Sequence, residues 1–210
     1  EQEAETVDNQ LLKAGDEAGA RIAFKQAGAL NHAQAWLSLG QETPDPKAAA
    51  RHTQRGRKFL EELARSKDAP TIQAARAAHM LGLLLLTSKA IPQNPRIAYR
   101  WIRRAAKADY APALADLARL QHRGVGTKAN PYAAEKSYRK AIALGQTGLR
   151  GALGNLYRNT GRPKKAEATF LDALAQLEAD NPIDSPKDST EERQALAGIL
   201  APLGDRKSVV

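Results

Sequence analysis

Small residues recur in this chain at spacings of seven and then eight, and the same set returns 36 residues later. The three copies of this set are Ala98, Ala105 and Ala113; Ala134, Ala141 and Leu149, where leucine takes the third place; and Ala20, Ala27 and Ala35. A fixed period of about 20 to 50 residues is typical of repeat proteins, in which each unit packs on its neighbours in the chain. We therefore expect an array of similar units.

A second signature follows each set, and it consists of a leucine and then a small residue. The four copies are Leu39-Gly40, Leu81-Gly82, Leu117-Ala118 and Leu153-Gly154, with steps of 42, 36 and 36 residues. The longer first step predicts an insertion near residues 65–70, where Pro70 is suited to open the next helix. A last half-copy, Ala166 and Ala173, follows a shorter connection at residues 161–163.

The segments between the Pro and Gly signals are rich in Ala, Leu, Arg, Lys, Glu and Gln, which favour helices, and runs of Val, Ile and Thr are missing. Two helices cross closely where the side chain at the crossing is no larger than Ala. Bulky residues beside these positions should fill the core. The residues that we expect there are Tyr99, Trp101, Ile102, Tyr138, Ile142 and Phe170.

The turns agree with a helical array. In residues 123–131, Gly124 and Gly126 can adopt positive φ, Asn130 is placed as an N-cap and Pro131 as the first helical residue. Asn94-Pro95 opens the preceding copy in the same way. The Gly-x-Gly pair is no nucleotide-binding fingerprint, because that motif needs a preceding strand and a third glycine.

Residues 77–141 resemble the Sel1-like repeat. The matching elements are Leu81-Gly82, Ala90-Ile91-Pro92-Gln93-Asn94, Ala98-Tyr99-Arg100-Trp101, Ala105-Ala106, Gly124-Val125-Gly126 and Asn130. Ser88 and Ala90 stand where the loop glycines usually are, and Ala118 replaces the helix glycine. Residues 149–174 look more like a tetratricopeptide repeat, with elements Leu153-Gly154, Tyr157, Gly161, Ala166 and Ala173.

Together these resemblances cover residues 16–178 and imply an all-α fold, a right-handed superhelical solenoid of helix pairs that binds protein or peptide and has no common enzymatic activity. We expect this solenoid over residues 1–178, a linker over 179–190 with two prolines, and an amphipathic capping helix over 191–203. Residues 204–210 are expected to form a disordered tail.

The resemblance also implies which residues meet a partner, because the first helix of a tetratricopeptide-like pair lines the concave groove. Its inward positions select six residues: Arg119, His122, Arg123, Asn155, Arg158 and Asn159. Arginine and asparagine suit carboxylates and peptide backbone. The alternative interpretation is that these are solvated polar residues without a ligand.

A second basic cluster follows helical spacing. Its members are Arg96, Arg100, Arg103, Arg104 and Lys107. They should project from one polar face that could meet an acidic partner or a membrane surface. An ordinary amphipathic helix with Trp101 and Ile102 on the opposite side explains the pattern as well, and Arg51, Arg55 and Lys58 allow the same two interpretations.

Several classes of function have no support in the sequence. The chain has no cysteine, its four histidines at 32, 52, 79 and 122 are scattered, and no catalytic motif occurs, so we predict no enzyme, no cofactor and no metal site. The longest apolar stretch, residues 80–86, is about a third of the roughly 20 residues that a membrane helix needs. Because the chain begins at Glu1, a removed signal or lipid-anchor segment stays open, as do further repeats.

Lys and Arg outnumber Asp and Glu by 32 to 23, and this net charge of +9 favours anionic partners. Our leading hypothesis is a non-enzymatic protein scaffold in a bacterial assembly. Some Sel1-like proteins are outer-membrane lipoproteins that organise the secretion of exopolysaccharides such as alginate, so the resemblance suggests the periplasm and an outer-membrane anchor, with the cytoplasm as alternative. A second hypothesis is direct binding of an anionic polymer through the Arg-rich faces. Nucleic acid is disfavoured because aromatic residues are few, at 5%, and are assigned to the core.

Overall fold

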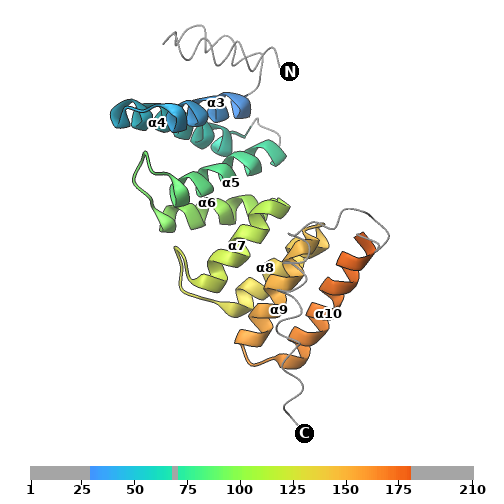
Figure 1. Ribbon diagram of the computed structural model, residues 1–210. Coiled ribbons are helices and arrows are strands. Elements are labelled where there is room, and N and C mark those ends of the chain that lie inside the picture. The colour runs from blue at the N-terminus through green and yellow to red at the C-terminus, as the bar shows by residue number, and fades with distance from the viewer. Residues whose placement is uncertain (1–28, 68–70, 181–210) are drawn as a thin grey trace, which may run out of the picture. The chain divides into compact units, whose positions relative to one another are not determined.

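The computed structural model describes residues 29–67 and 71–180, and these residues form helices in consecutive pairs without a strand (Figure 1). The α-helices are α3 (Ala29–Glu42), α4 (Pro46–Arg65), α5 (Thr71–Thr87), α6 (Pro95–Lys107), α7 (Ala111–Arg123), α8 (Pro131–Ala143), α9 (Arg150–Asn159) and α10 (Pro163–Asp180). A 3-10 turn, η1 (Thr147–Leu149), precedes α9. The predicted all-α class is confirmed. The predicted set at Ala20 and Ala27, the linker from residue 181, the capping helix and the tail lie outside the described residues.

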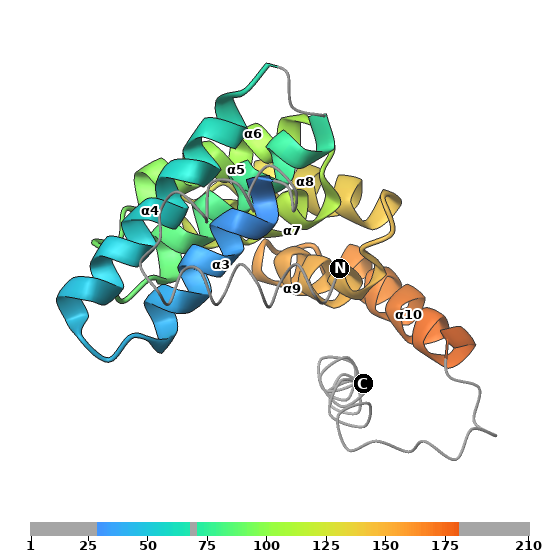
Figure 2. The same cartoon turned by 90° about the horizontal axis from the view of Figure 1, so that it is seen from above.

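The chain divides into two compact units. In the first, which ends at Ala113 and includes residues 125–128, α3 packs against α4, α4 against α5 and α5 against α6. Figure 2 shows α3 and α4 side by side, joined by the turn at residues 43–45. In the second, which contains residues 114–124 and continues from Ala129, α8 packs against α9 and α9 against α10.

The second helix of every described pair begins with a proline, at Pro46, Pro95, Pro131 and Pro163. Proline suits this position because the first N–H groups of a helix have no partner inside the helix. The Asn94 carboxamide accepts a hydrogen bond from the N–H of Ile97 at 3.1 Å, and Asn130 accepts one from the N–H of Ala133 at 3.0 Å. The predicted N-caps are confirmed, and Asp45 caps α4 in the same way.

From these prolines onward, the second helices bury the same three positions, which lie three, seven and ten residues further along. The buried residues are Ala49, Thr53 and Gly56; Ala98, Ile102 and Ala105; Ala134, Tyr138 and Ala141; and Ala166, Phe170 and Ala173. In the three pairs whose first helix carries a glycine, the middle position faces that glycine. A Cβ on Gly154 would lie 2.5 Å from the Phe170 ring, and Gly82 meets Ile102 in the same way. The small residues therefore mark close helix crossings, as predicted.

The 42-residue step from Gly40 to Gly82 is six residues longer than the other steps. Pro46 follows Gly40 by six positions, whereas Pro95 follows Gly82 by 13, but this shorter turn is offset because α4 has 20 residues and α6 has 13. The extra residues lie in the connection at residues 66–70 and at the start of α5, where Gly82 follows the first residue by 11 positions against seven for Ala118 in α7. The first pair therefore has a tight turn and a long second helix.

The two long loops of equal length close in the same way with different residues. Gly124 and Gly126 have φ of 72° and 70°, as predicted. In the preceding loop, the Ser88 hydroxyl accepts hydrogen bonds from the N–H groups of Ala90 and Ile91 at 3.2 and 3.3 Å. Both loops still end on a backbone hydrogen bond across nine residues, from Asn94 to Leu85 and from Asn130 to Gln121. A serine turn therefore replaces the glycines.

The expected core is right for three of its six large residues. Ile102, Tyr138 and Phe170 are buried, whereas Tyr99, Trp101 and Ile142 are only half-buried. Trp101 departs most from the prediction, because guanidinium groups lie over its ring. No helix in the described residues is long and apolar enough to cross a membrane.

Candidate partner-binding surfaces

Three of the predicted partner-binding residues lie on α7. Arg119 and Arg123 are exposed, and His122 is half-buried with its ring edge-on to Tyr138, the centroids 6.5 Å apart. The spacing of three and four places them on one side of the helix. Arg119 also pairs with Asp116 at 2.6 Å on the same helix. Exposed ion pairs of this kind contribute little, so the pair leaves the Arg119 guanidinium free to exchange partners.

Behind these residues, α7 is tied to α8 by a buried polar contact. The Ser137 hydroxyl donates to the Gln121 side-chain oxygen at 2.8 Å, and both residues are buried. Burial raises the pKa of the adjacent Tyr138 above 10, although the charges of Arg119 and Arg123 act in the opposite direction. The structure thus positions the exposed arginines on a helix whose other side is fixed.

The other three predicted residues lie on α9. Asn155 is half-buried, and Arg158 and Asn159 are exposed near the end of the helix. Each occupies the same repeat position as its counterpart on α7, because Arg119 and Asn155, His122 and Arg158, and Arg123 and Asn159 are each 36 residues apart. We call the six residues on α7 and α9 the first-helix strip.

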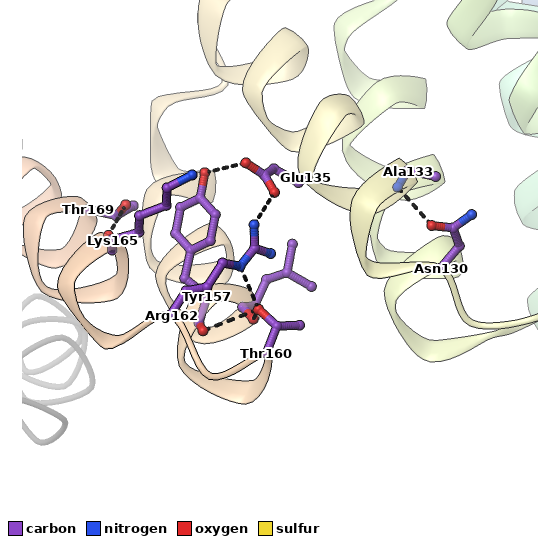
Figure 3. Close-up of polar contacts among 9 residues, drawn as sticks. Asn130, Ala133, Glu135, Tyr157, Thr160, Arg162, Lys165 and Thr169 are labelled. Atoms are coloured by element: carbon purple, nitrogen blue, oxygen red, sulfur yellow. Dashed lines mark hydrogen bonds and ion pairs between the residues drawn. The ribbon is translucent and has the colours of Figure 1, made fainter.

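A polar network that the sequence did not reveal holds α9 in place (Figure 3). The Tyr157 hydroxyl donates to Glu135 Oε1 at 2.9 Å, and Arg162 donates to Glu135 Oε2 at 2.5 Å. The Arg162 guanidinium also lies 4.7 Å from the Tyr157 ring centroid. Three segments are therefore joined: α8 through Glu135, α9 through Tyr157, and the start of α10 through Arg162.

The charges of this network favour an ionised Glu135. Burial tends to raise the pKa of its carboxyl group, but the hydrogen bonds from Arg162 and Tyr157, with the positive charges of Arg162 and Lys165, lower that pKa below 4.5. For Tyr157, burial and the bond to Glu135 raise the pKa. No spacing rule links residues 22 and 27 positions apart, so the sequence carried no signal for these contacts.

The predicted basic face on α6 is exposed, but its surroundings differ from the prediction. Four of its five residues line a hollow of about 490 Å³, and Arg96 does not. The lining residues are Arg65, Ile97, Arg100, Trp101, Arg103, Arg104 and Lys107. The expectation that Trp101 lies opposite the basic residues is wrong, because Arg65 and Arg104 lie over its ring at 5.4 and 5.8 Å from the centroid. We call this surface the α4–α6 basic hollow.

A further hollow in the second unit also carries positive charge. Arg139, Arg150 and Lys165 line it with Tyr157 and Asp172. Arg150 is paired there with Asp172. This internal carboxylate makes the second hollow less suited to an acidic ligand than the α4–α6 basic hollow, which has no acidic lining residue.

The histidines of the described residues have aromatic neighbours. His32 accepts a hydrogen bond from the Trp36 indole N–H at 3.1 Å, and His52 stacks on the same indole with centroids 5.4 Å apart. His79 lies edge-on to Tyr110. No group of three or more metal-binding side chains is found in residues 29–67 and 71–180.

A family model of the Sel1 repeat matches residues 75–110 and again residues 111–146. The two matched segments follow one another directly in the chain. One spans α5 and α6, and the other spans α7 and α8, which are the two pairs with the long inter-helix loops.

The pairs on either side of the Sel1 repeats have shorter turns. Pro46 follows Gly40 by six positions and Pro163 follows Gly154 by nine, whereas the proline follows the small residue by 13 positions in the Sel1 repeats. The N-cap also differs at the C-terminal end, where Arg162 precedes the proline of α10 in place of asparagine.

Solved structures show the same fold at low sequence identity. A Sel1 repeat protein from Oxalobacter formigenes is 19% identical, with a TM-score of 0.56 over 95% of this chain and 74% of that one. A MamA protein is 21% identical, with a TM-score of 0.52 over 88% and 99%. The c5321 protective antigen of uropathogenic Escherichia coli, which has an SLR fold, is 15% identical, with a TM-score of 0.53 over 96% and 54%. No curated protein matches. The Sel1 repeat fold is typical of non-catalytic protein-interaction scaffolds.

Proposed function

We propose that this chain is a non-enzymatic scaffold that binds an acidic protein partner through the first-helix strip. The observation that carries the proposal is the repetition of polar, accessible side chains at equivalent positions of α7 and α9. If α7 and α9 served only to pack, the two helices together would not need three arginines, a histidine and two asparagines at these positions. Equivalent positions of successive pairs are also where an extended ligand can be contacted more than once.

The chemistry of the strip favours carboxylates and peptide backbone. Arginine presents a planar fork of donors that matches a carboxylate, and asparagine can both donate to and accept from a backbone amide. Gln121 ties α7 to α8, and Tyr157 ties α9 to α8, so both helices that carry the strip are held in place. Asn155 and His122 are half-buried, which limits the motion of their side chains. A partner therefore meets donors that are already positioned, which reduces the entropy lost on binding.

For the cellular context, we extend the proposal to a bacterial assembly of the cell envelope, of the exopolysaccharide-secretion type. The support is the resemblance to exported Sel1-like scaffolds, which suggests a periplasmic protein with an outer-membrane anchor. Fractionation of the native cells tests this point. Recovery with the cytoplasmic fraction would overturn the envelope assignment and leave the scaffold proposal standing.

The second candidate function is direct binding of an anionic polymer, and the α4–α6 basic hollow is the observation in its favour. Polymer binding depends on the release of counterions, so affinity should fall steeply as salt rises. Titration with alginate and with a single-stranded oligonucleotide at low and physiological salt tests it. A flat response, or no binding, removes this candidate.

Affinity capture with defined variants tests the leading proposal. The strip variant carries Arg119→Glu, Arg123→Glu and Arg158→Glu, and the matched control carries Lys58→Glu, Arg76→Glu and Lys89→Glu at exposed positions elsewhere. Both change the net charge equally. We expect a discrete set of proteins to be retained by the control and lost by the strip variant, with equal helicity by circular dichroism. Retention by both would overturn the proposal.

A further inference from the structure

We propose that the α4–α6 basic hollow is a second docking site, separate from the first-helix strip, and that it holds a short, extended acidic segment of a protein partner. The site goes beyond the proposed function, because it lies on the second helices of two pairs and not on first helices. It stands or fails independently of the first-helix strip.

The charge of the hollow is uncompensated. Arg65, Arg100, Arg103, Arg104 and Lys107 are all exposed, and no acidic residue lines the hollow. In the part of the chain that the structure describes, none of the five forms an ion pair. Like charges three and four residues apart destabilise a helix by a few tenths of a kcal/mol per pair. The negative charges of an acidic ligand would attract each of these cations and so offset their mutual repulsion.

Trp101 fixes two of these cations. The guanidinium carbon of Arg65 lies 5.4 Å from the indole centroid and that of Arg104 lies 5.8 Å from it, both within the range of cation–π attraction. Arg65 comes from α4 and Arg104 from α6, so the arrangement exists only when the two helices are folded together. The site is therefore built by the tertiary structure, and a charged face on an isolated helix could not reproduce it.

The position of these guanidinium groups also selects among anionic ligands. A sugar ring or a nucleic acid base binds an exposed indole by stacking on its face. Here Arg65 and Arg104 lie over the Trp101 ring, and that ring is half-buried, so stacking is disfavoured. The forked donors around it match carboxylates, which arginine binds with two parallel hydrogen bonds.

The dimensions match a peptide of a few residues. From Arg100 to Lys107 the helix rises roughly 10 Å, at 1.5 Å per residue, which corresponds to about three residues of an extended strand. Ile97 and Trp101 provide an apolar wall beside the cations. The expected occupant is therefore a stretch of three or four residues that contains two or three Asp or Glu side chains.

The test measures fluorescence anisotropy of a labelled peptide, Gly-Gly-Asp-Glu-Asp-Gly, added to the full chain at physiological salt. We expect at least tenfold weaker binding for the matched peptide with Asn and Gln in place of Asp and Glu. Arg65→Gln combined with Arg103→Gln should weaken the acidic peptide at least tenfold. The control Lys58→Gln with Lys89→Gln should leave affinity within twofold, as should the strip variant. Circular dichroism shows whether each variant is folded.

Three results would overturn the inference. The first is equal loss of affinity in the Arg65/Arg103 variant and its control, which would mean general charge attraction. The second is tighter binding of an alginate oligomer or an oligonucleotide of equal charge than of the acidic peptide. The third is no binding of the acidic peptide. If the peptide binds as expected while the strip variant still captures its partners, this site holds and the proposed function fails, so the two outcomes are distinguishable.

Discussion

Gly126 faces the carbonyl group of Pro95 so closely that no side chain fits between them. The loop that follows α7 therefore lies directly on the first residue of α6. Gly126 also has a φ of 70°, which L-residues with a side chain rarely adopt. Two independent reasons thus require glycine at this position of the Sel1 loop.

Replacement of Gly126 by alanine should lower the free energy of unfolding by more than about 2 kcal/mol, because a left-handed conformation alone costs roughly 1–2 kcal/mol and the backbone clash adds to it. Gly161→Ala is the matched control, since Gly161 has the same φ of 70° but nothing within 4 Å of its would-be Cβ. Urea denaturation measures both. Equal losses for the two variants would show that the contact with Pro95 is unimportant.

The bond between Glu135 and Arg162 should make stability depend on pH in a defined direction. The folded-state pKa of Glu135 is lowered from 4.5, so its contribution is fully present above that value and is lost as the pH falls through the lower, folded value. Glu135→Gln should lower the free energy of unfolding by about 1–3 kcal/mol at pH 7. As the pH falls through the folded-state pKa of Glu135, the difference from the unmodified chain should shrink.

Urea denaturation at pH 7, 5 and 3 checks this, with Glu62→Gln as the control because Glu62 is exposed. A difference between the Glu135 variant and the unmodified chain that stays constant from pH 7 to pH 3 would contradict the ion-pair account.

The buried hydrogen bond from Ser137 to Gln121 predicts non-additive substitutions. Ser137→Ala alone leaves the buried Gln121 oxygen without its donor, which should cost about 1–3 kcal/mol. Gln121→Met removes the polar atom that would otherwise stay unpaired. The double variant should therefore be less destabilised than the sum of the single variants, as a thermal-unfolding cycle would show. Strict additivity would mean that the two side chains do not interact.

Much of the fold could be predicted from the sequence because small residues recur where helices cross. Gly82 and Gly154 are needed at those crossings, and the Asn-Pro pairs mark helix starts, so periodicity and capping rules were sufficient. The same rules could not predict Ser88, because a hydroxyl group and a pair of glycines close equivalent loops by different means.

The candidate surfaces were harder to predict, because their contacts join distant residues. Arg65 precedes Trp101 by 36 residues, and no motif indicates that its guanidinium lies over that ring. Helical spacing placed Trp101 in the core, but it cannot reveal which neighbouring helix leaves an indole partly uncovered. Arg162 likewise reaches Glu135 only because a turn brings the start of α10 beside α8.

Photocrosslinking in the native cells shows whether a protein partner lies against the first-helix strip. A photoreactive phenylalanine analogue replaces the exposed Asn159 on α9, and in a control chain it replaces the exposed Gln73 on α5. If the strip binds a protein, we expect a discrete protein adduct, identified by mass spectrometry, at Asn159 and not at Gln73. No adduct at Asn159, or the same adducts at both positions, would contradict binding at the strip.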